Sequence, residues 1–259
     1  MLGRVVPQPV LWQVQLALHA GSRFVCPFCG YHARDLKPFG LGLPVLKEKA
    51  VVGSGLRRAG CYKCGSTDRE RLVYVFVRDR LGAIRDAGRL RVLHIAPEPN
   101  LSRVLRETGF AEYVCGDLDA AGYAADAQVR AMNVLELAFE DDHFDLLICN
   151  HVLEHIIDDA AAMRSLYRVL KPGGHGILQV PISANSDETY EDPSITDPQQ
   201  RELHFGQSDH VRIYGRNYCR RLEAAGFSVQ TVNVSAAYPL MGLNPAEDIF
   251  AVEKPCRPR

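Results

Sequence analysis

Two pairs of cysteines are the residues whose spacing points most directly to a chemical role. Each pair encloses two residues, in Cys26-Pro-Phe-Cys29 and Cys61-Tyr-Lys-Cys64, and a glycine follows each pair. A tight turn ending in a glycine with positive φ brings two thiolates together, and two such turns supply the four sulfurs of a tetrahedral zinc site. Because four thiolates leave no coordination position open, we expect a structural zinc that stabilises a module with little core of its own.

A second set of reactive side chains follows a short apolar run. Leu146, Leu147, Ile148 and Cys149 form this run, and Asn150 and His151 come directly after it. Such a run is typical of a strand buried on both faces of a parallel sheet, and polar residues at its carboxyl end open onto a ligand crevice. His151 is therefore predicted to be a base or a substrate contact, whereas His155 is expected to lie in a helix and to serve packing.

The residues after this strand indicate the elements that position these side chains. Ala161, Leu166 and Val169 lie on one side of a predicted helix, which ends at Lys171-Pro172-Gly173-Gly174. Ile177, Leu178 and Val180 then indicate the next buried strand. A strand, a helix and a second strand are thus predicted within about forty residues.

This stretch resembles the class I S-adenosylmethionine-dependent methyltransferases. The matching residues are FDLLICNHVLEH, the helix that ends in RVLKPGG and the strand after it, and the resemblance extends over roughly residues 88–254. It implies an α/β fold, a doubly wound and mostly parallel seven-stranded Rossmann-like sheet, with S-adenosylmethionine as the cofactor. The alternative is an unrelated doubly wound domain with another ligand.

The same resemblance implies a set of cofactor-binding residues. In the family a glycine-rich loop follows the first strand, but here Ala96, Glu98 and Asn100 stand where the usual glycines fall. Glu98 is expected either to receive the ammonium group of the methionine part or only to favour a helix N-terminus. Asp117 is expected to bind the ribose hydroxyls. The full set is His94, Ala96, Pro97, Glu98, Asp117, Leu118, Asn133, Val134 and Asn150.

The segment 183–214 is a long polar insertion, and we interpret it as a candidate lid over the crevice. Its His210 is predicted to be a general base, oriented by Asp209 or by a neighbouring residue. The alternative is that the polar residues of the segment only fasten it to itself. The predicted catalytic residues are accordingly His210 and His151.

Charge and composition suggest how the chain is divided. Lys and Arg outnumber Asp and Glu in the first 86 residues, whereas the remainder is acidic and the formal net charge is −1. We expect a zinc-ribbon-like module at 1–66, a linking helix at 67–87 and a methyltransferase domain at 88–259. No apolar run is long enough to span a bilayer and no secretory pattern is present, so we expect a cytoplasmic protein without a membrane partner.

Three functions are compatible with these features. The first is methyl transfer to an O, N or C nucleophile of a small metabolite, beneath the segment 183–214. The second is RNA methylation, in which the basic zinc module binds phosphates. The third is S-adenosylmethionine binding without catalysis, which the glycine-poor loop would suggest.

Overall fold

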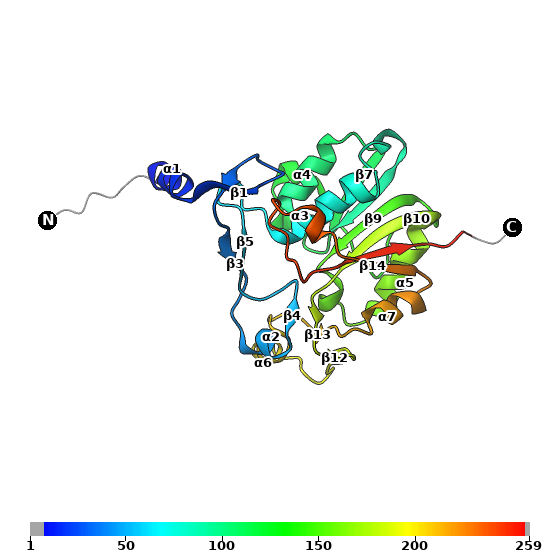
Figure 1. Cartoon of the computed structure of the whole chain (residues 1–259). Helices are drawn as coiled ribbons and strands as arrows, with labels where there is room; N and C mark the ends of the chain where they lie inside the picture. The colour runs from blue at the N-terminus through cyan, green and yellow to red at the C-terminus, as the bar shows by residue number, and fades with distance from the viewer. Residues whose placement is uncertain (1–7, 257–259) are drawn as a thin grey trace.

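The centre of the molecule is a seven-stranded sheet with helices on both faces, as the computed structural model of residues 8–256 shows (Figure 1). The strands of this sheet are β6 (Arg91–Ile95), β7 (Glu112–Asp117), β8 (Val129–Ala131), β9 (Phe144–Asn150), β10 (Leu170–Gln179), β14 (Ser228–Val232) and β15 (Ile249–Glu253). The α-helices are α1 (Gln8–His19), α2 (Pro44–Glu48), α3 (Asp68–Val75), α4 (Pro99–Glu107), α5 (Asp159–Val169), α6 (Pro198–Phe205) and α7 (Tyr218–Ala224).

The strand order is β14-β15-β10-β9-β6-β7-β8. The strands from β10 to β8 are parallel, and β15 pairs in antiparallel fashion with both β10 and β14. The predicted α/β class, with a doubly wound and mostly parallel sheet, is therefore confirmed. Consecutive parallel strands run outward from β6 in both directions, so a ligand crevice is expected at the carboxyl ends of β6 and β9.

Both faces of the sheet are covered, which explains why its strands are apolar without interruption. On β9, Leu147 and Cys149 belong to a core that includes residues of α5 and α7. Their neighbours Leu146 and Ile148 belong to a second core that includes residues of α3 and α4. Because successive strand side chains point to opposite faces, a strand between two layers of helices needs apolar residues at every position.

The N-terminal module is built from small pieces of sheet. β1 (Ala20–Val25) pairs with β2 (His32–Ala33), and β3 (Lys37–Phe39) pairs with β5 (Arg57–Gly60). β4 (Val51–Val52) instead pairs with β11 (Ile182–Ser183), which directly follows the central strand β10. The remaining hairpin joins β12 (Tyr190–Glu191) to β13 (Arg212–Ile213). In Figure 1, α2 and β4 consequently lie beside α6, at the carboxyl edge of the main sheet.

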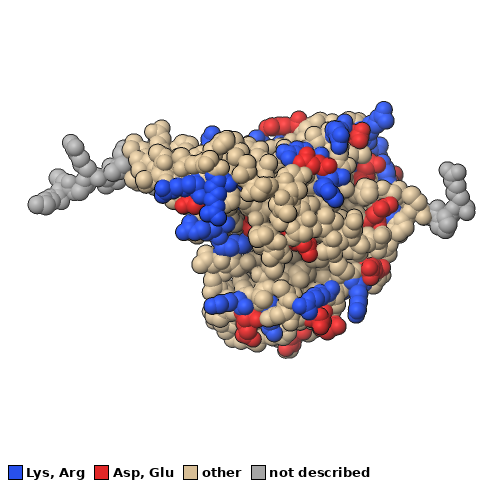
Figure 2. Space-filling model, in the orientation of Figure 1, with Lys and Arg blue, Asp and Glu red and all other residues tan. Residues whose placement is uncertain are grey.

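Two surface features belong to the same module. The helix α1 extends away from it, and its apolar side chains Leu11, Trp12, Val14 and Leu18 are exposed. Lys and Arg side chains gather over the strands β1, β3 and β5 in the view of Figure 2.

None of the helices within residues 8–256 has the length and apolar character that a bilayer crossing requires.

Candidate active site

The four predicted metal ligands lie together in the N-terminal module. The Sγ atoms of Cys26 and Cys64 are 3.6 Å apart, and those of Cys29 and Cys61 are 3.7 Å apart. A tetrahedral zinc with bonds of about 2.3 Å to sulfur places its ligand atoms about 3.8 Å from one another, so this cage has the size of a zinc site. No other set of four His, Cys, Asp or Glu ligands forms within the described residues.

The glycines that follow the cysteine pairs adopt the predicted conformation. Gly30 has φ of 66° and Gly65 has φ of 76°. Their amides donate to the carbonyl oxygens of Cys26 and Cys61, each at 2.9 Å. Each turn brings its two cysteines close together, which is the geometry that a pair of sulfurs needs to bind one metal ion.

The cysteine module contacts the loop where the family usually has glycines. The Asn100 side chain donates to the Cys64 carbonyl at 3.3 Å, and its backbone amide donates to Glu70 Oε1 at 3.1 Å. The other Glu70 oxygen accepts from the Thr67 amide at 2.8 Å, which closes the capping box of α3. The start of α4 is thus fixed from outside by the module and by α3.

A pocket of about 360 Å³ opens at the carboxyl ends of β6, β7 and β8. Ala96, Asp117, Leu118, Asn133 and Val134 line it, and all five are among the predicted cofactor-binding residues. Asp117 lies at the end of β7, where Oδ1 accepts from the Asp119 amide and Oδ2 accepts from the Tyr123 hydroxyl, both at 2.8 Å. Tyr123 was not predicted, since only the folded chain brings its hydroxyl to the carboxylate.

The backbone at this pocket has the shape that glycines usually provide. Ala96 has φ of 50°, in the left-handed region, and its amide donates to the Gly116 carbonyl at 2.8 Å. A Cβ on Gly116 would lie 2.5 Å from Met132 Sδ, so only glycine fits there. Gly116 thus lets Met132, which lines the pocket, pack directly against the end of β7.

The other predicted cofactor residues lie elsewhere. His94 is fully buried under the loop, where Nδ1 lies 2.8 Å from the Tyr113 hydroxyl and Nε2 lies 3.2 Å from Glu98 Oε2. Pro97 lines neither this pocket nor the adjoining chamber. Glu98 and Asn150 line the adjoining chamber, and the Asn150 amide donates to Glu98 Oε1 at 2.7 Å. Burial raises the pKa of Glu98, but the His94 ring and Arg69 outweigh this effect and hold it below its usual value.

The adjoining space, which we call the polar chamber, has a volume of about 270 Å³. It meets the first pocket at Ala96, His151 and His155, which line both. The other residues that line it are Ser54, Arg69, Glu98, Asn150, Glu154, Pro181, Gln207 and His210. Both predicted catalytic histidines therefore lie in one chamber, directly beside the candidate cofactor pocket.

His151 has a strained backbone and an unpaired ring nitrogen. Its φ is 53°, and its amide donates to the Gln179 carbonyl at 2.8 Å. Nδ1 lies 3.2 Å from Glu154 Oε1, whereas Nε2 is buried without a hydrogen-bond partner among the described residues. Burial, reinforced by Arg69, lowers the pKa of His151 to about 4, so the ring is neutral at pH 7. A neutral imidazole with a free nitrogen can accept a proton.

The surroundings of the other two histidines differ from the sequence-based expectation. His155 lies in a 3-10 turn (Leu153–His155) rather than in an α-helix, and it lines the chamber instead of packing in the core. Asp209 does not orient His210, because its Oδ2 lies 3.1 Å from His155 Nδ1. The Nδ1 of His210 instead donates to the Phe205 carbonyl at 3.3 Å. These side chains reach the chamber from a short turn and from a distant segment, for which the sequence contains no periodic signal.

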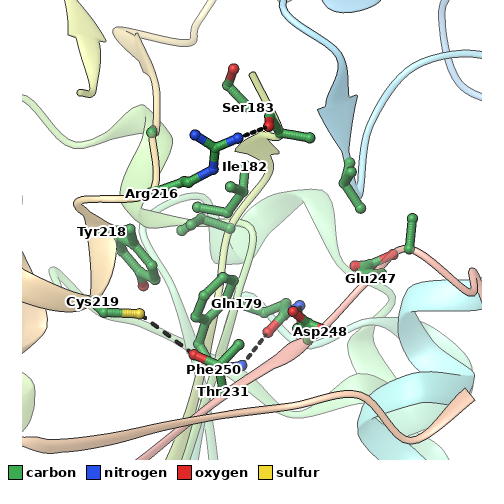
Figure 3. A pocket seen from close by; sticks show the side chains of 15 residues that line it. Gln179, Ile182, Ser183, Arg216, Tyr218, Cys219, Thr231, Glu247, Asp248 and Phe250 are labelled. Atoms are coloured by element: carbon green, nitrogen blue, oxygen red, sulfur yellow. Dashed lines mark hydrogen bonds between the residues drawn. The ribbon is translucent and has the colours of Figure 1, made fainter. Parts of the chain in front are cut away.

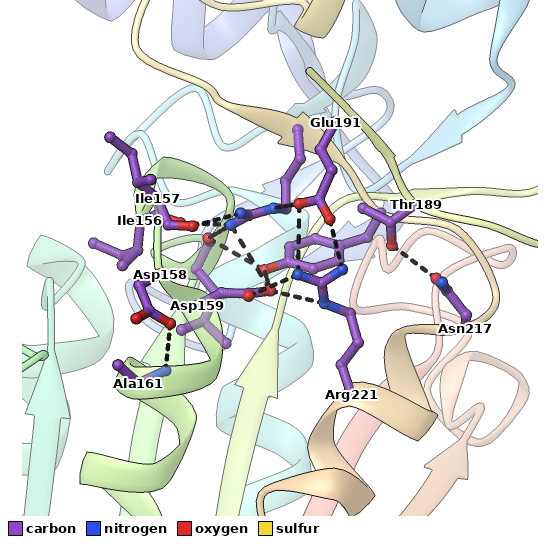
Figure 4. A network of polar contacts seen from close by, with 12 residues as sticks. Ile156, Ile157, Asp158, Asp159, Ala161, Thr189, Glu191, Asn217 and Arg221 are labelled. Carbon is purple, nitrogen blue, oxygen red and sulfur yellow. Dashed lines mark hydrogen bonds and ion pairs between the residues drawn. The ribbon is translucent and has the colours of Figure 1, made fainter. Parts of the chain in front are cut away.

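The segment 183–214 is fastened to the core (Figure 4). Arg212 donates to the carbonyl oxygens of Leu153 and Ile157, at 3.1 and 2.9 Å, and to Glu191 Oε2 at 2.7 Å. Asp159 lies beneath it and accepts from Tyr214 and Arg221. These residues hold the 151–157 turn and the end of the segment together, so the polar residues of the segment fasten it to this turn as well as to one another.

A third pocket, of about 340 Å³, lies behind the β4–β11 pair (Figure 3). Val52 and Ile182 of the paired strands line this pocket. Ser54 and Pro181, which lie next to these strands in the chain, line the polar chamber, so this pair of segments separates the two spaces. Glu247 lines the third pocket and is buried, and neither of its carboxylate oxygens has a hydrogen-bond partner among the described residues.

The strand order and the pocket at the carboxyl edge define the class: a doubly wound α/β domain with a nucleoside-type crevice. In comparison with known proteins, residues 85–178 match the family model described as "Methyltransferase domain". This part of the chain thus resembles a methyltransferase domain.

Curated relatives match over short stretches. The ubiquinone/menaquinone biosynthesis C-methyltransferase of Proteus mirabilis is 50% identical over 53 residues, which are 20% of this chain and 21% of that protein. The ubiquinone biosynthesis O-methyltransferase of Alkalilimnicola ehrlichii is 39% identical over 62 residues, 24% of this chain and 25% of that protein. The chain therefore aligns with only about a fifth to a quarter of the length of these relatives.

Among solved structures, the [4+2]-cyclase SpnF has the same fold. It superposes with a TM-score of 0.52 at 19% identity, over 77% of this chain and 84% of its own. At this identity the likeness concerns the fold alone, and a protein titled as a cyclase shows that the fold can serve other chemistry.

Proposed function

We propose that the protein is an S-adenosylmethionine-dependent methyltransferase that acts on a small polar acceptor held in the polar chamber. The observation that carries this proposal is the junction of the two spaces at Ala96, His151 and His155. A cofactor seated at the end of β7 would present its methyl group toward this junction, where an acceptor in the chamber can meet it.

In this proposal the residues of the first pocket hold the cofactor. Asp117 accepts hydrogen bonds from the ribose, and Asn133 and Val134 flank the adenine. S-adenosylmethionine supplies an already activated methyl group, so the chain mainly orients the two reactants and excludes water. His151 accepts a proton if the acceptor is a hydroxyl. Its ring is positioned by Glu154, at 3.2 Å.

We further infer that the four-cysteine cage binds one structural zinc ion, which the sulfur spacing supports. A reducing compartment such as the cytoplasm would keep these thiolates available for the metal. RNA is the second candidate substrate, because basic side chains gather on the same module (Figure 2). We favour a small acceptor, since the chamber holds only about 270 Å³ and is lined in part by His210 and Gln207 of the segment 183–214.

Calorimetry with S-adenosylhomocysteine tests the cofactor assignment. Asp117→Ala removes the carboxylate at the end of β7, and we expect the product to bind roughly 10- to 100-fold more weakly, because a hydrogen bond to a charged group contributes about 1.5–3 kcal/mol. The exposed carboxylate of Asp126 provides the control, and Asp126→Ala should bind like the parent protein. Absence of binding by the parent protein, or equal affinity in Asp117→Ala, would refute the assignment.

A further inference from the structure

Three side chains in the polar chamber form a cluster that the proposed methyl transfer does not fully use. One ligand atom from each of Glu154, His155 and His210 lies within 4.8 Å of the others. Glu154 and His155 come from the turn after β9, and His210 comes from the segment after α6. Two imidazoles and one carboxylate around a common point form a set that transition-metal ions bind, with coordination positions left open for other ligands.

Glu154 has a vacant oxygen that is buried. The residue is only 1% exposed, and Oε2 has no hydrogen-bond partner among the described residues. Its other oxygen contacts a single ring, that of His151, at 3.2 Å. A buried carboxylate is costly unless it is paired or bound to a metal. Arg69 is the only Lys or Arg that lines the chamber, and it lies over the Phe39 ring, with Cζ 5.8 Å from the centroid.

The two histidines are held as metal-binding histidines usually are. The Phe205 carbonyl can only accept, so His210 carries its proton on Nδ1 and keeps a lone pair on Nε2. His155 Nδ1 lies 3.1 Å from Asp209 Oδ2, and this carboxylate favours the same tautomer. A carbonyl or carboxylate behind one ring nitrogen fixes the tautomer and raises the basicity of the other nitrogen.

From these contacts we propose that Glu154, His155 and His210 bind a divalent first-row transition-metal ion in the polar chamber. Two imidazole ligands favour Mn²⁺, Fe²⁺, Co²⁺ or Zn²⁺ over Mg²⁺ or Ca²⁺, which prefer oxygen. The open positions face the 270 Å³ chamber and take an oxygen of the acceptor.

This inference rests on the proposed function in one respect, since it names the acceptor of that same site. A bound divalent ion lowers the pKa of an oxygen ligand, as it does for water. The acceptor class is therefore a small molecule with a hydroxyl beside a second oxygen donor, such as a catechol or an α-hydroxy acid. The hydroxyl oxygen would then bond to the methyl carbon as the bond from that carbon to sulfur breaks, and S-adenosylhomocysteine would leave. The hydroxyl proton would pass to His151, whose Nε2 has no hydrogen-bond partner among the described residues, or to solvent.

Cobalt provides a spectroscopic test that is independent of methyl transfer. The protein is loaded with one equivalent of Zn²⁺, to fill the cysteine cage, and is then titrated with Co²⁺. We expect one further equivalent to bind with weak visible bands from nitrogen and oxygen ligands, without the intense sulfur charge-transfer band that cobalt in the cysteine cage would give. His155→Ala and His210→Gln should each weaken this binding at least about tenfold.

A second histidine–carboxylate pair supplies the matched control. His143 Nε2 lies 2.8 Å from Glu112 Oε2, directly before β9, whereas the chamber lies at the end of that strand, so His143→Gln should bind cobalt like the parent protein. Cobalt that enters only the cysteine cage, or binding that both chamber variants retain, would overturn the proposal. Calorimetry with S-adenosylhomocysteine reports separately on the cofactor pocket, so either result can fail while the other stands.

Discussion

At the scale of single residues, Glu247 is a buried carboxylate in an unfavourable environment. Burial, together with the nearby charge of Asp68, raises its pKa to about 7, and neither of its oxygens has a hydrogen-bond partner among the described residues. In the unfolded chain the same group releases its proton near pH 4.5. Between these two values the folded state binds more protons than the unfolded state, so stability falls as the pH rises.

Glu247→Gln should therefore stabilise the protein, increasingly so at higher pH. We expect the gain in the free energy of unfolding to grow from about 1 kcal/mol or less at pH 5 to about 3 kcal/mol at pH 8. Urea denaturation at the two pH values measures it, with the exposed Glu223→Gln as the control that should change little. A gain that is equal at both pH values would contradict the assigned environment.

Individual site residues were predictable where a strand end placed them. Asp117 and His151 each come directly after an apolar run, and the carboxyl ends of parallel strands meet at one edge of the sheet. Arg69 was not predicted as a site residue, because nothing in α3 distinguishes a basic side chain that enters a chamber from one that faces solvent. His155 was placed in a helix because the turn that carries it has no periodicity of its own.

At the scale of elements, Arg212 joins the segment 183–214 to the turn that carries the chamber residues. It is 4% exposed, and it donates to Leu153, Ile157 and Glu191. Arg212→Met keeps most of the volume but removes the side-chain donor to the carbonyl oxygens of Ile156 and Ile157, while that of Leu153 still accepts from the Tyr214 hydroxyl. We expect a loss of about 3–5 kcal/mol in the free energy of unfolding.

Arg216 provides the comparison for this substitution. It pairs with Asp187 at the surface, and the two side chains are 57% and 81% exposed. Exposed pairs contribute little, so Arg216→Met should change stability by less than about 1 kcal/mol in the same urea titration. Equal effects of the two substitutions would mean that the segment is not held through Arg212.

The β4–β11 pair was also beyond prediction from sequence. The short strands contain two residues each, and the Ser183 hydroxyl that donates to the Lys49 carbonyl bridges 134 positions along the chain. Such pairing is fixed by tertiary packing rather than by local pattern. The seven strands of the main sheet, by contrast, were largely predictable, because burial on both faces makes their composition distinctive.

At the scale of the whole molecule, the cysteine module contacts the helix that follows the proposed cofactor pocket. Cys64 and Glu70 hold Asn100, which opens α4 directly after the loop at Ala96. Removing zinc should release this contact and weaken binding of S-adenosylhomocysteine about tenfold, a coupling of about 1.4 kcal/mol. Calorimetry before and after chelation measures this change.

Coupling of this kind must operate in both directions. Saturating S-adenosylhomocysteine should therefore slow the chelator's extraction of zinc, and it should strengthen zinc binding by the same factor. Cys256→Ser, which changes an exposed cysteine outside the cage, should leave both measurements unaltered. An equal rate of zinc extraction with and without S-adenosylhomocysteine would show that the module and the pocket are not coupled.

The separation of the two spaces by β4, β11 and their flanking residues has a practical consequence for the expression of a shorter fragment. Trimming the gene to residues 85–178 would preserve everything that the family model matches. The recombinant piece would nevertheless lack five of the side chains around the polar chamber: Ser54, Arg69, Pro181, Gln207 and His210. It would keep the strands that line the proposed cofactor pocket but lose one side of the space proposed to hold an acceptor.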